Sequence, residues 1–257
     1  LNGREVARNG NGHTPFGIDI TQALHRDEEN ILIVQAMDRP EDKGRLLGKQ
    51  GSWYTHTSGI WQTVWLEAAP KSRLANLRLR GGFLPGRLTI EGAVEGEMPA
   101  GARVEWTLAR EADAVARGET PLNGRDFRTE QHVDVRPWSP DDPVLYEAAI
   151  ALVAGGEETD RIVARIGFRS FESRDGEFLL NGAPVYLRGV LNQAFHPDGL
   201  YTYPSDETIR DDIQAAKDAG YNLVRLHIKV DEPRLRHWAD EIGMLLWGEP
   251  PSIPDAG

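Results

Sequence analysis

Apolar side chains recur with a helical period in one stretch near the end of the chain. Ile209, Ile213 and Ala216 stand at positions i, i+4 and i+7, which places them on one face of a helix. Ser205 is a preferred N-cap residue, and the two acidic residues after it suit the first turn of a helix. Gly220 then favours a C-terminal stop. The pattern predicts an amphipathic helix between these two residues.

Short apolar runs surround this helix and predict buried strands. They are residues 185–190 before it, YNLVRLHI at 221–228 after it, and MLLW at 244–247. A second helical pattern begins near Pro233 and ends at Gly243. Strands that alternate with helices through short connections are buried on both sides only in a parallel sheet covered by helices. We therefore expect a parallel α/β unit with three strands in the last part of this sequence.

The earlier part of the chain shows the period of β-structure. Residues 71–166 contain six alternating runs separated by Gly- and Pro-rich turns, which is typical of a β-sandwich of about seven strands. In residues 1–69, the β-branched and apolar runs at 30–37 and 61–69 predict two further strands. Residues 38–59 have little periodicity and are long for a connection, so they form either a functional loop or a packed irregular one.

Charge and composition narrow the possible partners. The chain has 29 Lys and Arg against 40 Asp and Glu, a net charge of −11, which argues against nucleic acid and anionic membranes as partners. It has no cysteine, no apolar run of about 20 residues and no signal-peptide pattern at its start. The compartment therefore stays unknown, with the cytoplasm as the default. His13, His25 and His56 lack the spacing of a metal site, so neither metal nor cofactor is expected.

Three motifs in the last third resemble one known family. LLNGAPVYLRGVLNQAFHPDG at 179–199, NLVRLHIKV at 222–230 and WADEIGMLLWGEPPS at 238–252 resemble the start of the catalytic barrel of family 2 glycoside hydrolases. This family includes bacterial β-galactosidases, β-glucuronidases and β-mannosidases. Upstream, PWSPDDPVLY at 137–146 resembles an element of the family's immunoglobulin-like domain, and SGIW…VWLE at 58–67 resembles its jelly-roll domain.

The resemblance implies a multidomain organisation. Residues 1–69 would be a sugar-binding-type jelly-roll β-sandwich without its N-terminal part, and residues 70–166 an immunoglobulin-like β-sandwich. Residues 167–257 would be the first β/α units of a (β/α)8 TIM barrel, truncated after the third strand. We expect exposed sheet edges in such a partial barrel, which would also permit self-association into a homo-oligomer.

The same resemblance implies a retaining hydrolase that cleaves β-linked O-glycosidic bonds in carbohydrates. Retention requires two carboxyl groups about 5 Å apart, one a nucleophile and the other an acid and base. In the family, both are glutamates on later barrel strands, and here they are expected C-terminal to Gly257. No catalytic residue is therefore assigned, and this chain alone is expected to be inactive. Glu249 lies near the barrel mouth but is expected to have a structural role.

Candidate substrate-binding residues follow the predicted strand ends, because the C-terminal ends of barrel strands carry binding groups. Arg225 and His227 are two positions apart on one strand, so their side chains share a face. They would bind sugar hydroxyls or orient the absent glutamates; the alternative is an arginine paired with a structural carboxylate, beside a satisfied histidine. The remaining candidates come from the loop after the first strand and from the end of the third strand: Asn192, Gln193, His196 and Trp247.

Two alternatives to these interpretations stay open. Trp53, Trp61 and Trp65 could stack on sugars, but the spacing of Trp61 and Trp65 in an extended run places these two on one side of a strand, which favours packing in a sheet core. The whole chain could also belong to a non-catalytic carbohydrate-binding or structural multidomain protein. The residues that follow this stretch would distinguish an enzyme from such a protein.

Overall fold

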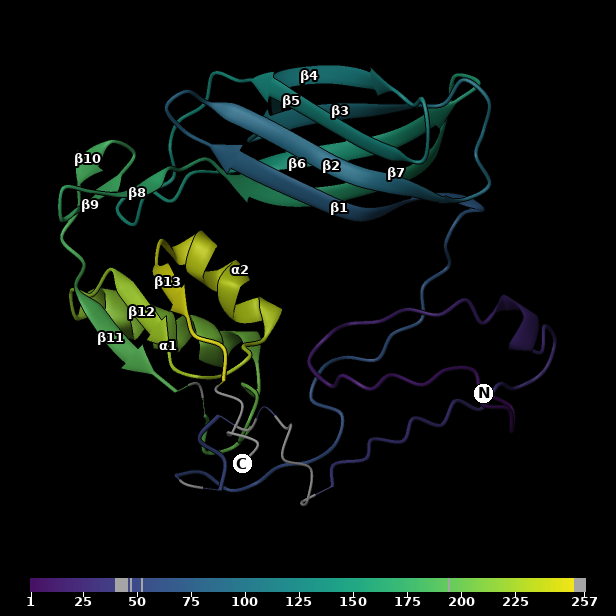
Figure 1. Cartoon of the computed structure of the whole chain (residues 1–257), viewed down its shortest axis with the longest axis horizontal. Helices are drawn as coiled ribbons and strands as arrows, with labels where there is room; N and C mark the ends of the chain where they lie inside the picture. The colour runs from purple at the N-terminus through teal and green to yellow at the C-terminus, as the bar shows by residue number, and fades with distance from the viewer. Residues whose placement is uncertain (40–45, 47, 52, 194, 252–257) are drawn as a thin grey trace.

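The computed structural model describes residues 1–39, 46, 48–51, 53–193 and 195–251. Three regions are visible in Figure 1: a β-sandwich, a smaller unit of parallel strands and helices, and an extended N-terminal segment. The last six residues of the predicted barrel region and part of the irregular stretch 38–59 lie outside the described residues.

The β-sandwich consists of two antiparallel sheets, and all of its residues are described. One sheet has the order β1-β2-β5, and the other has the order β4-β3-β6-β7. The strands are β1 (Ser72–Gly82), β2 (Arg87–Gly96), β3 (Arg103–Arg110), β4 (Asp113–Pro121), β5 (Asp126–His132), β6 (Leu145–Ala154) and β7 (Glu157–Gly167). The prediction of a sandwich of about seven strands is confirmed.

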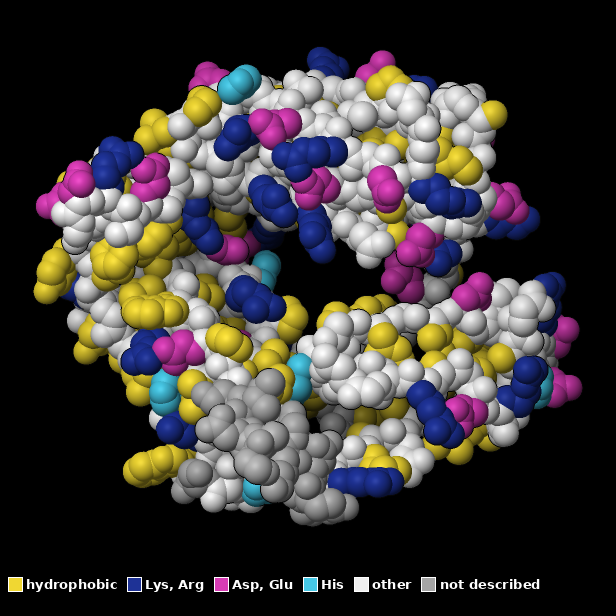
Figure 2. Space-filling model, viewed as in Figure 1, with side chains coloured by type: hydrophobic (Ala, Val, Ile, Leu, Met, Phe, Trp, Pro, Cys, Tyr) yellow, Lys and Arg dark blue, Asp and Glu magenta, His cyan; other side chains and the backbone are white. Residues whose placement is uncertain are grey.

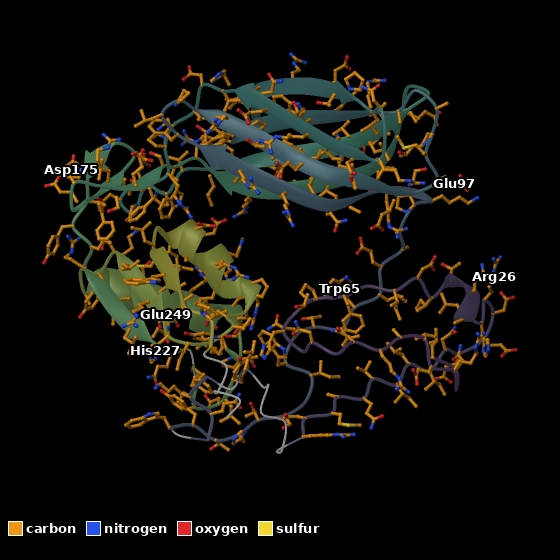
Figure 3. All side chains as sticks on the ribbon, in the orientation of Figure 1. Arg26, Trp65, Glu97, Asp175, His227 and Glu249 are labelled. Carbon is orange, nitrogen blue, oxygen red and sulfur yellow. The ribbon has the colours of Figure 1, made fainter. Side chains whose placement is uncertain are left out.

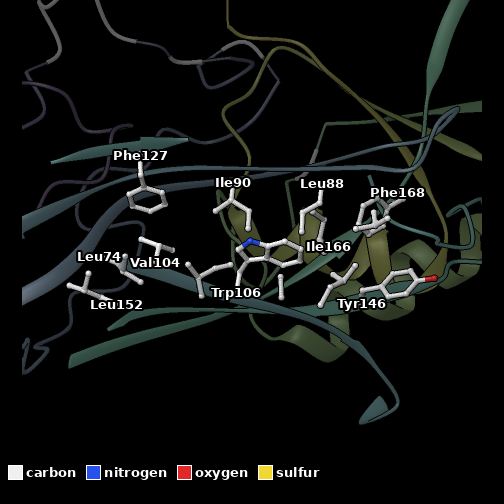
Figure 4. Close-up of a cluster of buried hydrophobic side chains, with 14 of the residues drawn as sticks. Leu74, Leu88, Ile90, Val104, Trp106, Phe127, Tyr146, Leu152, Ile166 and Phe168 are labelled. Carbon is white, nitrogen blue, oxygen red and sulfur yellow. The ribbon is translucent and has the colours of Figure 1, made fainter. Parts of the chain in front are cut away.

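The period-two alternation in these strands builds one apolar core between the sheets. On β3, Val104, Trp106 and Leu108 are buried while the residues between them are more exposed, as the pleat of a strand requires. They meet the buried Leu88 and Ile90 of β2 from the opposite sheet. Figure 4 shows these side chains interleaved between the layers. The sandwich therefore has a core of its own and does not depend on the parallel unit for burial.

The parallel unit (residues 189–251) has the predicted alternation of strands and helices. Its elements are β11 (Gly189–Asn192), α1 (Asp206–Asp218), β12 (Leu223–Leu226), α2 (Pro233–Ile242) and β13 (Leu245–Gly248). The sheet order is β11-β12-β13, and both pairings are parallel.

Both helices begin and end for the predicted reasons. The Ser205 hydroxyl accepts a hydrogen bond from the Thr208 amide, and the chain takes a left-handed conformation at Gly220 after α1. Pro233 is the first residue of α2, and Gly243 ends it with φ 87°. Both helices cover one face of the sheet, where residues such as Ile209 pack with Val224 and Leu226 of β12 in a single apolar cluster.

One strand begins later than predicted. The run at 185–190 predicts the first parallel strand, but β11 begins only at Gly189. The Val185 amide donates to the Phe178 carbonyl at 2.9 Å, so this part of the run extends a neighbouring hairpin instead.

That hairpin belongs to a small antiparallel sheet that the sequence patterns did not predict. Its strands are β8 (Phe171–Arg174), β9 (Glu177–Leu180) and β10 (Ala183–Pro184), in the order β10-β9-β8. The turns are Asp175-Gly176 and Asn181-Gly182, and all four residues have positive φ. Asp-Gly and Asn-Gly pairs are the usual signal of two-residue hairpins, so the sequence did contain the information.

The N-terminal segment (residues 1–69) differs from the prediction. Its described residues contain a 3-10 helix, Thr21–Ala23, and no strand, so the strands predicted at 30–37 and 61–69 are not formed. Ile33 is 78% exposed and Leu66 is 73% exposed, and Figure 2 shows apolar side chains on the surface of this segment. β-Propensity becomes a strand only where a neighbouring backbone pairs with it. In the described chain, the run at 30–37 receives one backbone hydrogen bond from outside, from the Asn2 amide to the Ile31 carbonyl at 3.0 Å, and one such bond does not make a strand.

Trp61 and Trp65 of this segment correct a second prediction. Trp65 is exposed and Trp61 is half-buried, so they do not share a sheet core. Trp61 instead donates from Nε1 to the Gly12 carbonyl at 2.7 Å and packs edge-on against Tyr201, with ring centroids 5.4 Å apart. It therefore joins the N-terminal segment to the parallel unit.

Trp138 joins the β-sandwich to the parallel unit. It is fully buried and packs with Leu223 and Leu245 at the beginning of β12 and β13. Its indole Nε1 donates to the Asp240 carbonyl at 2.8 Å, in the last turn of α2, where carbonyl groups lack partners within the helix. The Arg169 guanidinium lies 4.6 Å from its ring centroid. Trp138 thereby supports the sheet from below, at the end opposite the candidate site.

Candidate functional site

One row of side chains crosses the face of the parallel sheet that the helices leave open. In the register of the sheet, Leu191 lies beside Arg225, and Arg225 lies beside Trp247. Residues alternate between the two faces of a strand, so this row lies on the face opposite Val224 and Leu226, which pack under the helices. Trp247 is 56% exposed on this face. The row lies near the C-terminal ends of the strands, where binding groups were predicted.

Arg225 is paired with a carboxylate from the end of the next strand. Its Nε donates to Glu249 Oε1 at 2.8 Å, and a second nitrogen of the guanidinium donates to the same oxygen. The guanidinium also lies 5.5 Å from the ring centroid of Trp247. The hydrogen bond from Arg225 lowers the pKa of Glu249, so this carboxyl is ionised near neutral pH and cannot serve there as a proton donor. The structural role expected for Glu249 agrees with this geometry.

His227 approaches the same carboxylate from just beyond β12. Its Nε2 lies 4.0 Å from Glu249 Oε2, and its amide donates to the Asn192 carbonyl at 2.9 Å. Among the described residues, its buried Nδ1 has no hydrogen-bond partner. The structure therefore brings Arg225 and His227 together at one carboxylate, and for Arg225 this is the pairing that the sequence left open as the alternative. Contact of either side chain with sugar stays a prediction.

Asn192 is the last residue of β11 and Gln193 follows it, and tyrosines hold both side chains. Asn192 Nδ2 donates to the Tyr203 hydroxyl at 3.0 Å. Gln193 Oε1 accepts from the Tyr54 hydroxyl at 2.6 Å. Tyr54 belongs to the N-terminal segment, 139 positions earlier in the chain. No local pattern identifies this residue, because its relation to the site exists only after the chain has folded.

His196 has a local role in the loop. Its Nδ1 accepts from the Asp198 amide at 3.1 Å, and its backbone pairs with that of Leu200 in both directions. These contacts form a turn within the loop after β11. The structure thus describes His196 as a turn residue, and its contact with sugar stays a prediction.

A buried charged cluster lies beside this loop and was not predicted. Lys229 is 4% exposed, donates to the Tyr201 carbonyl at 2.6 Å, and lies 5.1 Å from the Phe195 ring centroid. Burial lowers the pKa of Lys229 to about 8 and raises the pKa of Asp231 to about 6. In the sequence these residues follow a strand in a polar run, which is also the pattern of an exposed turn, so periodicity alone could not identify them.

Neither a metal centre nor a membrane-spanning helix is found in the described part of the chain. No group of three His, Cys, Asp or Glu side chains there is placed to hold a metal ion. None of the helices described is long and apolar enough to cross a membrane. A groove of about 430 Å³ lies between the sandwich and α2, lined by Arg165, His237 and Glu241 among others, and the candidate site residues are not part of its lining.

Figure 3 labels His227 and Glu249, which lie side by side in the lower part of the parallel unit. The site therefore offers one guanidinium and one imidazole beside an ionised carboxylate, with an exposed indole ring next to the guanidinium. The two side-chain amides lie at the end of β11, and that of Asn192 is held by Tyr203 on the side of the helices. Such groups bind and orient polar ligands such as sugars. A nucleophile and a proton donor at the separation that retention requires are not among these groups.

Comparisons with known proteins agree with the resemblance of the motifs. The family model of the glycosyl hydrolases family 2 matches residues 89–169. A protein of Formosa agariphila whose name proposes a beta-glucuronidase is 29% identical over 98% of this chain and 31% of its own length. A beta-galactosidase of Thermoanaerobacter pseudethanolicus is 27% identical over 100% of this chain and 36% of its own length. The chain thus spans about a third of the length of these curated relatives.

Solved structures show the same fold relationship. A beta-glycosidase from Bacteroides vulgatus superposes with a TM-score of 0.68 at 21% identity, over 75% of this chain and 26% of that one. Beta-glucuronidase 2 of Bacteroides uniformis superposes with a TM-score of 0.67 at 24% identity, over 77% of this chain and 26% of that one. At these identities the similarity concerns the fold.

Proposed function

This chain is a relative of the family 2 glycosyl hydrolases over nearly its whole length, and from that premise we propose that it forms part of a retaining enzyme that cleaves β-linked O-glycosidic bonds in carbohydrates. The observation that carries the proposal is the cluster at the C-terminal ends of β12 and β13. There Arg225 and His227 meet Glu249 on the open face of a parallel sheet.

We assign the three regions to the domains of such an enzyme. The N-terminal segment (residues 1–69) corresponds to part of a jelly-roll domain, and residues 70–166 to an immunoglobulin-like domain. Residues 167–257 correspond to the first β/α units of a TIM barrel. The assignment is supported by the seven-stranded sandwich and by the parallel sheet β11-β12-β13, whose strands alternate with helices as in a TIM barrel. The face of the sheet that the helices leave open would be the interior of the barrel.

In this enzyme, the residues of the site would bind and orient the sugar. The two catalytic glutamates would come from later strands, so the groups described here do not form or break the glycosidic bond. Glu249 holds the Arg225 guanidinium in place, and the amides of Asn192 and Gln193 offer hydrogen bonds to hydroxyl groups. Trp247 presents an exposed ring on which a sugar can stack, and His196 would bind sugar from the loop after β11.

The test is a kinetic comparison in the full-length enzyme. Arg225→Ala and His227→Ala are each expected to lower kcat/KM by about 30- to 1000-fold, which corresponds to about 2–4 kcal/mol of lost transition-state stabilisation. Arg174→Ala serves as the control, because Arg174 pairs with Glu172 on the distant hairpin. Activity within twofold of wild type in both site variants would show that they are structural.

The substrate screen uses aryl β-galactoside, β-glucuronide, β-mannoside and β-glucoside. Turnover of at least one of them by the full-length protein is the expected result. Binding of sugars without turnover of any substrate would instead favour a non-catalytic carbohydrate-binding protein.

A further inference from the structure

The contact between Tyr54 and Gln193 joins the N-terminal segment to the candidate site. The oxygen atoms of the two side chains are 2.6 Å apart. Hydroxyl-to-oxygen hydrogen bonds have a most common length of about 2.7–2.8 Å, whereas amide N–H donors stay near 2.9–3.0 Å from their acceptors. The short separation therefore indicates that the tyrosine hydroxyl donates and that the carbonyl oxygen of the glutamine side chain accepts.

The aromatic ring of Tyr54 is held independently of this hydrogen bond. It stacks on Phe195 with ring centroids 4.0 Å apart and an angle of 1° between the planes. Phe195 in turn packs edge-on against Tyr201, and the Lys229 ammonium lies 4.5 Å from the Tyr201 ring centroid. Aromatic pairs contribute about 0.5–1.5 kcal/mol beyond the area that they bury. Removing only the hydroxyl of Tyr54 should therefore leave the ring in place.

This arrangement decides which end of the Gln193 amide is available to a ligand. A glutamine side chain has an acceptor oxygen and an NH2 group with two donors. The oxygen accepts the hydrogen bond from Tyr54, and no hydrogen bond of the NH2 group is found among the described residues. Gln193 is the next residue after Asn192, whose carbonyl accepts from the amide of His227, so the side chain starts beside the candidate site. The end of the amide that remains available beside the site is thus a donor.

We propose that Tyr54 is a positioning residue of the sugar site: it fixes the Gln193 amide with its NH2 group toward the bound sugar, so that this position selects an acceptor oxygen. The proposal rests on the proposed function and adds to it a residue from the N-terminal segment. A free glutamine amide would present either end to the sugar. With its oxygen held by Tyr54, Gln193 donates to a hydroxyl or carboxylate oxygen of the substrate, and the ordering of the side chain is complete before the sugar binds.

The experiment is a double-mutant cycle in the full-length enzyme, on whichever aryl glycoside the wild type hydrolyses. Tyr54→Phe is expected to raise KM about 3- to 10-fold with kcat within twofold, because a positioned hydrogen bond contributes equally to substrate and transition-state binding. Gln193→Leu should have an effect at least as large. If Tyr54 acts through Gln193, Tyr54→Phe should have no further effect when Gln193→Leu is already present.

Tyr186→Phe is the matched control, since it removes the same atom from a residue that is 81% exposed and away from the site. It should leave KM unchanged. A KM for Tyr54→Phe equal to wild type, or effects of the two substitutions that simply add, would overturn the proposal. A comparison of Gln193→Glu on β-glucuronide and β-glucoside identifies the acceptor: a substrate carboxylate would make the glucuronide the more strongly affected of the two.

A second measurement separates this inference from the proposed function. If the wild-type enzyme hydrolyses none of the four aryl glycosides, the proposed function fails. The side-chain amide signal of Gln193 then tests the hydrogen bond to Tyr54. This signal is identified in a ¹⁵N-correlated NMR spectrum by its loss in Gln193→Leu. A shift of that signal in Tyr54→Phe supports the positioning role, and an unchanged signal overturns it.

Discussion

Replacement of Trp138 by alanine should loosen the parallel unit while leaving the sandwich folded. The indole packs under the beginning of β12 and β13 through Leu223 and Leu245, and its Nε1 donates to the last turn of α2. The β-sandwich keeps its own core around Trp106, to which Trp138 does not belong. Trp138→Ala therefore removes support from the unit that carries Arg225 and Glu249.

The expected magnitude follows from the burial of the indole. Trp138 is fully buried, and substitution of such a tryptophan by alanine costs about 3–5 kcal/mol. Part of this loss is the hydrogen bond to the Asp240 carbonyl, since a hydrogen bond contributes about 0.5–1.5 kcal/mol. Trp138→Phe keeps most of the packed volume and should lose mainly that second part. Whole domains are stable by about 5–15 kcal/mol, so the alanine variant should open the parallel unit measurably.

Native-state hydrogen exchange of the 257-residue chain measures the two regions separately. The amides of β12 should exchange faster in Trp138→Ala, whereas those of β6 should keep their protection. Trp65→Ala is the control, because Trp65 is 68% exposed and its loss should change stability by less than about 0.5 kcal/mol. Equal losses of protection in β6 and β12, or no loss in β12, would refute the reasoning.

Three further outcomes are expected. Burial raises the pKa of Asp231 from 3.8 to about 6, so between these pH values the folded state holds a proton that the unfolded state releases. The free energy of unfolding should therefore fall as the pH rises from about 4 to 6. Urea unfolding at several pH values measures this slope, and Asp231→Asn should flatten it. The 257-residue chain by itself should hydrolyse no aryl glycoside in an assay of purified protein, because the site lacks a nucleophile and acid pair; turnover that Glu249→Gln abolishes would contradict this. Gly96→Ala should destabilise the sandwich by about 1–3 kcal/mol in chemical denaturation, because a Cβ would lie 1.9 Å from the Lys71 carbonyl oxygen at a φ of +80°, whereas Gly124→Ala, with open space around it, should not.

Local sequence determined the elements whose signals are local. Helix α1 begins and ends where Ser205 and Gly220 predict, and the six period-two runs form six of the seven strands of the sandwich, all but β4. The parallel order of β11, β12 and β13 followed from the short connections between strands and helices. The Asp175-Gly176 turn has an equally local signal, but the strands on either side of it have only four residues each, too short for a clear apolar pattern.

Tertiary structure alone decided the contacts that make the site. Arg225 could have met any carboxylate, and only the pairing of β12 with β13 selects Glu249. Tyr54 reaches Gln193 across 139 positions of sequence. The apolar run at 30–37 has the composition of a strand but forms no strand among the described residues, because hydrogen bonding between strands and burial depend on distant neighbours. The sequence of a segment limits which secondary structures it can form, and the residues that fold against the segment determine which of them it adopts.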